Sequence, residues 1–292
     1  MSNVSLIDDI VGTLMLPFNM VSTVSSYLAN HVRVLSIDPY RIEYGISDGK
    51  RTARLEIRQG RSSSSGTVSW TYSGKRLVFN YTSKKELVDV IRMVKSEFLL
   101  EESGWLGVKG KKVLDIGGYT GDTAIYFALN GAKHVFALEP YPYFYNLARK
   151  NVLSNRLGSK ITMVNAGVGR KNSHIRVDSD ADSFSSSSFK AGKRMKSVPI
   201  MSLGEIVRKY RLDDAALKMD CEGYEYETIL ESSDETLRKF SEMEIEYHYG
   251  YLNLQKRLIK AGFKVTVKRP MKRYNFGTGT VMVNGFMHAK RS

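Results

Sequence analysis

The chain has 292 residues, of which 42% are hydrophobic and 25% are charged, and these ordinary proportions exclude a wholly disordered protein. A single cysteine, Cys221, excludes an intrachain disulfide and a cysteine-rich zinc site and suits a reducing compartment. The 44 lysines and arginines exceed the 30 acidic residues, and no acidic residue follows Glu246. This basic C-terminal segment would attract nucleic acid, anionic lipid or a phosphorylated substrate, unless its charges serve only solvation.

The N-terminal segment, residues 1–31, carries no charge from residue 10 onward but is interrupted by Gly12, Pro17 and several serines and threonines. It is therefore too polar for a membrane-spanning helix, which needs about 20 predominantly apolar residues. The segment is not expected to be a secretory signal either, because Asp8 and Asp9 stand where such a signal has positively charged residues. We expect a helical segment that packs on the body of the protein, with a membrane anchor as the alternative.

Short β-prone runs separated by turn clusters follow the N-terminal segment. The five runs are residues 32–37, 41–46, 53–58, 67–72 and 76–81. They predict an antiparallel meander, which would form a small accessory β module. Thr82 or Ser83 is placed to cap a helix whose apolar residues, from Leu87 to Leu99, recur at helical spacing. We expect the module and this linker helix to occupy residues 32–105.

Strands that alternate with helices are predicted from Lys111 onward. The predicted strands are residues 113–116, 134–138, 161–164, 215–219 and 243–247, and the helices between and after them start near Asp122, Tyr141, Ser202, Tyr224 and Tyr251. This alternation is typical of a mostly parallel sheet wrapped by helices. Two further β-prone runs, 264–268 and 279–288, close the chain, and a serine-rich stretch, 183–188, lies in an insertion after the third strand.

A glycine-rich turn after the first of these strands is the first motif that indicates a ligand. The strand runs into VLDIGGYTGDT, in which Gly117 and Gly118 permit close approach of the backbone to a ligand and Gly121 permits tight packing of the next helix. The spacing fits neither the G-x-G-x-x-G dinucleotide fingerprint nor a phosphate-binding loop. A ligand other than a dinucleotide or a nucleoside triphosphate is therefore expected.

Two acidic residues narrow the identity of that ligand. Asp115, before the first glycine, would suit a positively charged amino-acid group. Glu139 ends the next strand, where a carboxylate accepts hydrogen bonds from ribose hydroxyls. A nucleoside that carries an ammonium group and no phosphate is S-adenosylmethionine. Solvation of the strand ends is the alternative role for both carboxylates.

The residues around these motifs resemble the FkbM family of S-adenosylmethionine-dependent methyltransferases. The resemblance covers roughly residues 111–263 and rests on DIGGYTGDTAIYFALNGAKHVFALEPYPYFYNLARKNVLSN, on KMDCEGYEYETIL and on EIEYH. Its most specific part is the D-x-E-G-x-E element, residues 220–225. Tyr119 stands where the wider methyltransferase superfamily often has glycine. The N-terminal segment and the β module lie outside the resemblance.

The resemblance implies an α/β protein with the class I methyltransferase fold over residues 106–292. This is a Rossmann-like, doubly wound sheet, mostly parallel with an antiparallel last strand, preceded here by the β-rich accessory module and the N-terminal helical segment. The resemblance also implies methyl transfer to a hydroxyl of a sugar, a glycolipid precursor or a related metabolite. We expect a cytoplasmic protein, with a membrane-peripheral one as the alternative.

Roles at the cofactor site follow from the same resemblance. The turn would shape the methionine pocket, Glu139 would hold the ribose, and Asp220, at the end of the fourth strand, would face the reactive methyl group. Asn165 and Ala166, just past the third strand, lie where the adenine ring is usually flanked. The implied cofactor-binding residues are Asp115, Gly117, Gly118, Gly121, Glu139, Asn165, Ala166 and Asp220.

Four side chains that could activate an acceptor hydroxyl follow or end adjacent strands: Asp220, Glu222, Glu246 and His248. A hydroxyl must lose its proton during methyl transfer, and His248 is the predicted base, with Asp220 and Glu222 as the other catalytic candidates. The four could instead hold a divalent cation that acidifies the hydroxyl, or His248 could be structural. Lys218, inside the apolar fourth strand, is expected to pair with one of these acids.

Cys221 is predicted to be a packed thiol. Methylation of a pyrimidine ring carbon uses a cysteine nucleophile, but strand alternation turns this side chain away from the side that Asp220 faces. Two rival functions stay open. One is an RNA methyltransferase that uses the basic C-terminal surface and would show strongly salt-dependent binding. The other is a non-catalytic nucleoside-binding module, which loss of Asp115 or Glu139 would have supported.

Partner predictions concern the basic C-terminal segment. The expected acceptor is a small molecule or glycan that could be anionic, with nucleic acid as a weaker candidate and peripheral membrane contact as a further one. The helix near Tyr251 should bury Leu252, Leu254, Leu258 and Ile259 and turn Lys256, Arg257 and Lys260 outward. A basic cluster is predicted around Pro270: Lys268, Arg269, Lys272 and Arg273.

Overall fold

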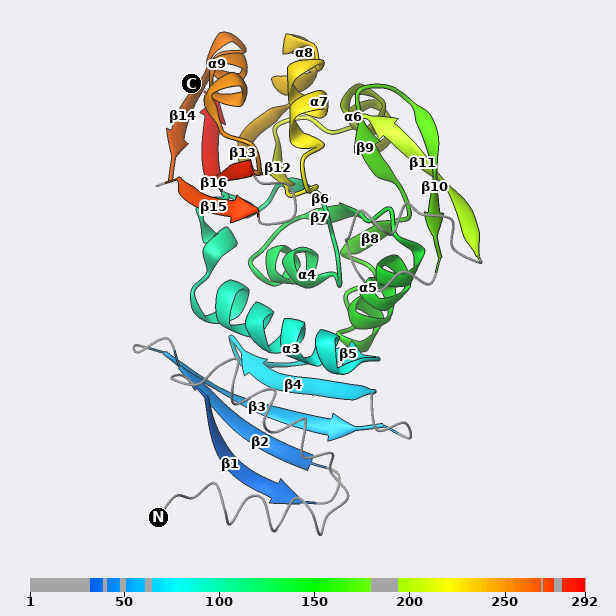
Figure 1. The fold of residues 1–292 in the computed structure, drawn as a ribbon, viewed down its shortest axis with the longest axis vertical. Coiled ribbons are helices and arrows are strands. Elements are labelled where there is room, and N and C mark those ends of the chain that lie inside the picture. The colour runs from blue at the N-terminus through cyan, green and yellow to red at the C-terminus, as the bar shows by residue number, and fades with distance from the viewer. Residues whose placement is uncertain are drawn as a thin grey trace. The chain divides into compact units, whose positions relative to one another are not determined.

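The computed structural model describes residues 32–38, 41–47, 51–60, 65–179, 194–268, 270–275 and 280–291 (Figure 1). The chain divides into two compact units, Met1–Glu102 and Ser103–Ser292. The predicted helical segment 1–31 and the serine-rich stretch 183–188 lie outside the described residues. Among the described residues, no helix is both long enough and apolar enough to cross a membrane.

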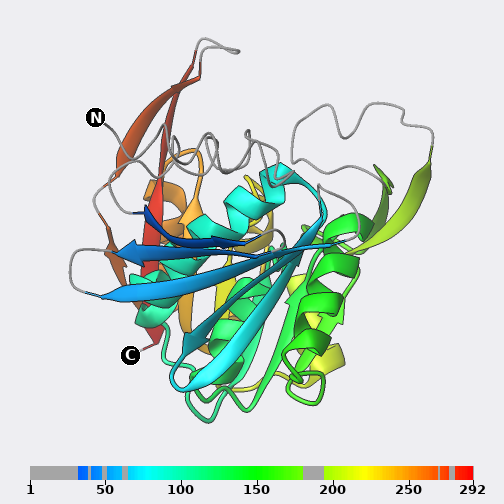
Figure 2. The ribbon, with the colours of Figure 1, turned by 90° about the horizontal axis from the view of Figure 1, so that it is seen from below.

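The first unit contains a five-stranded antiparallel meander, as the alternating runs predicted. Its strands are β1 (Val32–Asp38), β2 (Arg41–Ser47), β3 (Thr52–Gln59), β4 (Gly66–Tyr72) and β5 (Lys75–Tyr81), and they pair in sequential order (Figure 2). One face is apolar, with Leu55, Val68 and Phe79 buried because strand side chains alternate between faces. α3 (Lys84–Met93) begins after Ser83, whose hydroxyl accepts the Glu86 N–H as predicted for a cap.

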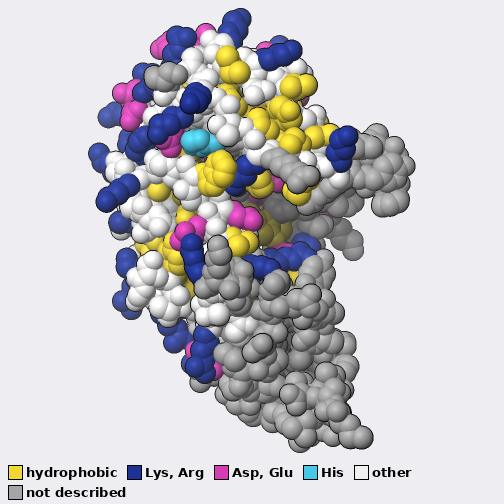
Figure 3. All heavy atoms as spheres, turned by 90° about the vertical axis from the view of Figure 1, so that its left-hand side faces the viewer, with side chains coloured by type: hydrophobic (Ala, Val, Ile, Leu, Met, Phe, Trp, Pro, Cys, Tyr) yellow, Lys and Arg dark blue, Asp and Glu magenta, His cyan; other side chains and the backbone are white. Residues whose placement is uncertain are grey.

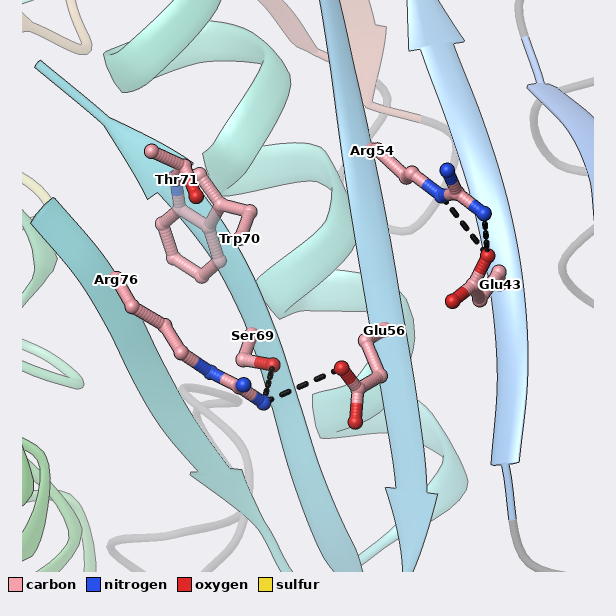
Figure 4. A pocket seen from close by; sticks show the side chains of 7 residues that line it. All are labelled: Glu43, Arg54, Glu56, Ser69, Trp70, Thr71 and Arg76. Carbon is pink, nitrogen blue, oxygen red and sulfur yellow. Dashed lines mark hydrogen bonds and ion pairs between the residues drawn. The ribbon is translucent and has the colours of Figure 1, made fainter. Parts of the chain in front are cut away.

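The other face of this meander is polar and lines a cavity of about 450 Å³ (Figure 4). Arg54 Nε donates to Glu43 at 2.8 Å, and Arg76 Nη2 donates to Ser69 Oγ at 2.9 Å and lies 3.2 Å from Glu56 Oε2. Arg54 is therefore paired with a carboxylate of the neighbouring strand β2, and Arg76 reaches across β4 to a carboxylate of β3. Such cross-strand pairs stabilise a solvated sheet face and explain why charged residues alternate with apolar ones along β3.

The second unit is built on a mostly parallel sheet with the strand order β14-β16-β13-β12-β6-β7-β8. β16 runs antiparallel to β13 and to β14, and all other neighbours on this path are parallel. The predicted α/β class, with an antiparallel last strand, is confirmed. The strands are β6 (Lys112–Ile116), β7 (His134–Leu138), β8 (Ile161–Val164), β12 (Ala215–Met219), β13 (Phe240–Tyr247), β14 (Phe263–Val267) and β16 (Thr280–Arg291).

Helices follow the strands at the predicted places and cover both faces of this sheet (Figure 1). They are α4 (Asp122–Leu129), α5 (Pro142–Ser154), α6 (Leu203–Tyr210), α7 (Glu225–Leu230), α8 (Asp234–Leu237) and α9 (Leu252–Lys260), preceded by the short helices η1 (Val94–Leu99) and η2 (Glu102–Trp105). Four of them, α6 to α9, contribute to a core of side chains that includes Ile206, Ile229, Leu237 and Leu254. Helices on both faces leave the carboxyl ends of the strands as the open edge.

Several elements were not predicted. β9 (Gly167–Gly169), β10 (Ser173–Asp178) and β11 (Met195–Ser202) form a small separate sheet within the insertion after β8. β15 (Met271–Asn275) pairs with β16 between the two predicted last strands. The apolar signal of these segments is weak: in β11 only Val198 and Met201 are buried, so a long apolar run is absent.

α9 differs from the prediction in the side it buries. Leu254 and Leu258 are fully buried, but Leu252 and Ile259 have exposed fractions of 59% and 54%. A helix turns by about 100° per residue, so positions 252 and 259 lie close to the opposite side from 254 and 258. The predicted stripe of four residues was therefore wrong for Leu252 and Ile259, because one helix cannot bury both sides against one sheet.

Arg257, which was predicted to face outward, and Lys268, from the predicted basic cluster, both contact other side chains. Arg257 Nη1 lies 2.6 Å from Asp234 Oδ1, and Lys268 Nζ lies 3.9 Å from the centre of the Trp105 ring. Lys256, Lys260 and Lys272 are exposed, as predicted. The side chains of Arg269 and Arg273 lie outside the described residues.

Candidate active site

The glycine-rich turn after β6 brings two strand ends into backbone contact. Gly117 has a φ of +85°, and a Cβ built on it would lie 1.7 Å from the carbonyl oxygen of Asp220, just past β12. Only glycine tolerates both this conformation and this approach. The turn and the D-x-E-G-x-E element, about a hundred positions apart in the chain, therefore meet at one edge of the sheet.

Tyr119 has a backbone conformation that favours glycine. Its φ is +38°, in the left-handed region that side chains disfavour. Its N–H donates to Glu139 Oε2 at 3.0 Å, and its ring centre lies 4.6 Å from that of Phe144. These contacts offset the cost of the backbone conformation, which is typical of functional turns.

Glu139 is buried at the carboxyl end of β7, with 1% of its surface exposed. Oε1 accepts the N–H of Tyr141 at 2.9 Å, and Oε2 accepts that of Tyr119. Burial raises the pKa of Glu139 to about 8, although these two hydrogen bonds lower it. Asn165 Nδ2 donates to the Glu139 carbonyl at 3.0 Å, whereas Ala166 is fully buried in the core. Of the two residues predicted to flank adenine, only Asn165 has a side chain partly open to solvent.

Lys218 lies between the carboxylates of Asp115, on β6, and Asp220, just past β12. Its Nζ lies 4.0 Å from Asp115 Oδ1 and 3.5 Å from Asp220 Oδ2, so the predicted pairing with an acid is confirmed. Asp115 is fully buried and accepts the hydroxyl of Thr123 at 2.7 Å. Burial raises the pKa of Asp115 to about 6, and Lys218 opposes that shift. Asp115 therefore faces Lys218 and the helix that follows the turn, and its predicted role at the cofactor stays a prediction.

His248 lies among the carboxylates of the D-x-E-G-x-E element. Its Nδ1 is 3.0 Å from Glu225 Oε1, and its Nε2 is 3.4 Å from Glu222 Oε2 and 3.9 Å from Asp220 Oδ1. Glu225 is fully buried and also accepts the N–H of Cys221 at 3.1 Å. Because a carboxylate only accepts, Nδ1 carries a proton that it donates to Glu225, and Nε2 points toward Asp220 and Glu222.

The ionisation of this cluster is shifted from its usual range. Burial disfavours the charged ring of His248, but the hydrogen bond to Glu225 and the charges of Glu225, Glu222 and Asp220 outweigh it and raise its pKa to about 9. The pKa of Glu246 is raised chiefly by burial. The negative charge of Asp220 and a hydrogen bond between the two carboxyl groups raise it further. Asp220, Glu222, Glu246 and His248 are thus brought together as the sequence predicted, although their catalytic roles stay predictions.

Glu225 is the member of this cluster that the sequence analysis missed. Ligand atoms of Asp220, Glu225 and His248 lie within 4.8 Å of one another, the arrangement nearest to a cation site among the described residues. Glu222 and Glu246, which were candidate ligands in the alternative with a divalent cation, do not belong to that group. The signal was present as the last acid of D-x-E-G-x-E, but its pairing with His248 depends on how α7 packs beside β13.

Cys221 packs against the hydrophobic core, as predicted for a thiol without a catalytic role. Burial and the nearby carboxylates of Glu225 and Asp220 raise its pKa well above the usual value. A thiol must lose its proton to act as a nucleophile, so these surroundings keep it unreactive.

Comparison of the sequence with models of protein families shows to which family the chain belongs. The model of the methyltransferase FkbM domain matches residues 115–264, more than half of the 292 residues. The chain belongs to the FkbM methyltransferase family. The match includes the glycine-rich turn, Glu139 and the D-x-E-G-x-E element, and the strand order with an antiparallel β16 is that of the class I methyltransferase fold.

Individual proteins match this chain only over a short stretch or at low sequence identity. Ribosomal protein L11 methyltransferase of Carboxydothermus hydrogenoformans is 44% identical over 55 residues, 19% of this chain and 18% of that protein. TrmK of M. capricolum, solved with S-adenosylhomocysteine, is 17% identical with a TM-score of 0.41, over 67% of this chain and 68% of that one. The tRNA m1G37 methyltransferase of M. jannaschii is 14% identical with a TM-score of 0.41, over 77% and 57%. This chain thus spans less than a fifth of the curated relative, whose substrate does not carry over.

Proposed function

We propose that this FkbM family member is an S-adenosylmethionine-dependent methyltransferase that methylates a hydroxyl oxygen of a sugar, a glycolipid precursor or a related metabolite. The observation that carries the proposal is the position of His248. Its Nε2 faces Asp220 and Glu222 at the carboxyl edge of the sheet, and Asp220 is the residue whose backbone contacts the glycine-rich turn. A proton acceptor beside a turn that can receive a cofactor is what O-methylation requires.

Two features of the turn fit S-adenosylmethionine. At Gly117 the space that a side chain would fill is occupied by the carbonyl oxygen of Asp220, so the turn and the end of β12 border one site. The Glu139 oxygens each accept one backbone N–H and each have a second lone pair for a ribose hydroxyl. Gly117, Gly118, Glu139 and Asn165 would hold the cofactor, and Asp115 would support the turn from within. When bound, the cofactor supplies an electrophilic methyl group on a sulfonium.

The acceptor hydroxyl would be prepared by His248, Asp220 and Glu222, while Glu225 positions the ring of His248. Nε2 of His248 is placed to take the hydroxyl proton after losing its own, and Glu225 holds the ring in the orientation that leaves Nε2 free for this. Asp220 and Glu222 are hydrogen-bond acceptors that would bind neighbouring hydroxyls of the acceptor and so orient the reacting oxygen toward the methyl group. Alignment of the reacting atoms is a large part of catalysis in such displacements.

The charge and shape of the site favour a neutral polyhydroxylated acceptor over RNA. Asp220, Glu222 and Glu225 surround His248 and would repel a phosphodiester backbone. Tyr224 and Tyr249, which border this cluster, have exposed fractions of 46% and 64% and offer flat apolar surfaces beside the carboxylates. Ligand sites commonly combine such apolar surfaces with a few oriented polar groups.

Product analysis tests the proposal. The protein is incubated with S-adenosylmethionine carrying a labelled methyl group and with fractionated glycan, lipid and RNA pools, and the product is located by mass spectrometry. A labelled ether oxygen is the expected result, and label in RNA bases or on nitrogen contradicts it. Cofactor binding without any labelled product would support the non-catalytic alternative.

The same assay separates base catalysis from metal assistance. Asp220, Glu225 and His248 could hold a divalent cation, which would acidify the hydroxyl in place of a base. Activity that survives a chelator supports His248 as the base. Activity that is lost with the chelator and restored by added Mg²⁺ or Mn²⁺ assigns the cluster to a cation instead.

A further inference from the structure

The outer side of α9 exposes apolar and cationic side chains together. Leu252 and Ile259 are more than half exposed, and Lys256 and Lys260 are exposed on the same side of the helix. A helix rises by about 1.5 Å per residue, so Leu252 and Ile259 lie roughly 10 Å apart along it with Lys256 between them. Solvent-facing helix positions are normally polar, and two large aliphatic residues here are not explained by packing in the core.

The exposed side chains continue onto the neighbouring segments. The N–H of Gly250 donates to the carbonyl of Val283 at 2.7 Å, and Val283 pairs with Lys272 on β15. Tyr249 and Met271, beside these contacts, have exposed fractions of 64% and 46%. We call the set the α9 surface: Tyr249, Leu252, Lys256, Ile259 and Lys260. Figure 3 shows the side of the molecule that includes α9 and β14, with hydrophobic side chains gathered in its upper part and lysines and arginines around them.

The lysines of this surface differ from the other cations nearby. Arg257 is paired with Asp234, and Lys290 lies 2.7 Å from Glu242. Within the described ranges, no salt bridge involves Lys256 or Lys260. The charge of Lys260 helps to lower the pKa of Asp234, but Asp234 forms its salt bridges with Arg257 and Arg238. The surface is therefore cationic as well as apolar.

One end of the α9 surface reaches the candidate active site. The N–H of Tyr249 donates to the hydroxyl of Tyr226 at 2.8 Å, one residue after His248. Its ring lies against Gly223 of the D-x-E-G-x-E element, where an added Cβ would be 2.7 Å from Tyr249 Cε2. A partner that covers the α9 surface would therefore border the place where an acceptor must enter.

We propose that the α9 surface docks on an anionic lipid surface. Apolar side chains that enter the boundary between headgroups and acyl chains, with lysines that meet the headgroup phosphates, are the features by which helices lie on membranes. RNA would match the lysines but would leave Leu252 and Ile259 unexplained. In combination with the proposed function, this orientation presents the active site to hydroxyls carried by lipids, such as the sugar of a glycolipid precursor.

Vesicle co-sedimentation with the full chain tests the docking. Vesicles of phosphatidylcholine are compared with vesicles that also contain phosphatidylglycerol, at low and at high salt. The variants are Leu252→Ser with Ile259→Ser, and Lys256→Glu with Lys260→Glu. The matched control is Lys150→Glu with Leu153→Ser on α5, where Leu153 is 63% exposed and Lys150 is also exposed. Circular dichroism establishes that each variant is folded.

The expected result is binding that requires phosphatidylglycerol and weakens with salt. Charge reversal at the two lysines should weaken it at least tenfold, since each lysine near such a surface contributes about fivefold. Loss of the two aliphatic side chains should weaken it by about tenfold, and the control should change it by less than about twofold.

Three results would overturn the proposal. One is no binding of the wild type to phosphatidylglycerol vesicles at low salt. Another is vesicle binding that is unchanged in the Leu252→Ser, Ile259→Ser variant. Attraction between opposite charges, which RNA would provide equally well, would then explain the binding. The third is a wild-type dimer in analytical ultracentrifugation that the aliphatic variant converts to a monomer, which would make this surface an interface between copies. The assay contains neither cofactor nor acceptor, so its outcome is independent of whether methyl transfer is correct.

Discussion

The two halves of the candidate active site are built by different means. The half around β6 and β7 uses backbone groups: the turn at Gly117, the N–H groups of Tyr119 and Tyr141, and one buried carboxylate that accepts both. The half around β12 and β13 uses ionisable side chains, chiefly His248 and Asp220, whose charges depend on one another. The first half suits the cofactor, and the second suits the acceptor hydroxyl. Mutations in the first half should therefore change mainly cofactor affinity, and mutations in the second half mainly the rate of methyl transfer.

The largest effect is expected from His248→Ala, which alters only the acceptor half. Removal of a positioned base should lower kcat/KM by roughly 10² to 10⁴-fold while cofactor affinity stays within about twofold. Steady-state kinetics and calorimetry measure the two quantities. His134→Ala, at the amino end of β7, is the matched control and should leave both unchanged. Equal loss of cofactor affinity and rate in His248→Ala would contradict the division into halves.

Gly117→Ala should damage both halves, because it separates the turn from β12. The new Cβ would lie 1.7 Å from the carbonyl oxygen of Asp220 at a φ of +85°. We expect the free energy of unfolding to fall by about 2 to 4 kcal/mol and cofactor binding to be lost. Gly110→Ala is the control: its φ is +76°, but nothing lies within 4 Å of the added Cβ. Backbone strain alone should cost it about 1 kcal/mol in a denaturant titration. Equal losses in the two variants would contradict the steric explanation.

Glu139→Ala should affect the cofactor half alone. Loss of hydrogen bonds to ribose should weaken S-adenosylmethionine binding by about 2 to 3 kcal/mol in calorimetry. The carboxyl group also holds the N–H groups of Tyr119 and Tyr141, so Glu139→Gln is needed as the isosteric variant. The amide oxygen of the introduced glutamine can replace one of the two carboxylate oxygens as acceptor. The affinity for S-adenosylmethionine should therefore lie between that of the wild type and that of Glu139→Ala. Unchanged affinity in both variants would remove Glu139 from the cofactor site.

The smallest effect is expected from Glu225→Gln, which should move a pH profile rather than abolish activity. His248 has a pKa of about 9, raised in part by Glu225, so kcat/KM should rise with pH as the ring loses its proton. The amide keeps a hydrogen-bond acceptor but removes the charge, which lowers the pKa of His248 and moves the rising limb to lower pH. A uniform loss of rate with no shift of the limb would make Glu225 merely structural.

The same pair has a consequence for stability. A folded-state pKa above the usual 6.5 means that protonated His248 stabilises the fold fully below about pH 6.5, and that this contribution is lost as the pH rises through about 9. The difference in unfolding free energy between the wild type and Glu225→Gln should therefore shrink across this interval. Denaturant titrations at several pH values measure it.

The elements of this fold could largely be predicted from local patterns. Short alternating runs predicted β1 to β5, apolar runs predicted the strands of the parallel sheet, and Ser83 predicted the start of α3. These features depend on neighbours within a few residues, where side-chain alternation and helix capping operate. The weakly apolar β9 to β11 and β15 escaped prediction because their strand conformation depends on pairing with distant segments.

The sequence by itself determined the glycine-rich turn, the acids at the strand ends and their order along the chain, because strand ends and glycine turns are local features. Only the tertiary structure decided that Glu225 meets His248, 23 positions away, and that Asp115 faces Lys218 on a neighbouring strand. It also decided which side of α9 is exposed, since four apolar residues at helical spacing cannot show which pair meets the sheet. Such contacts depend on how elements pack together, and packing is a property of the whole chain.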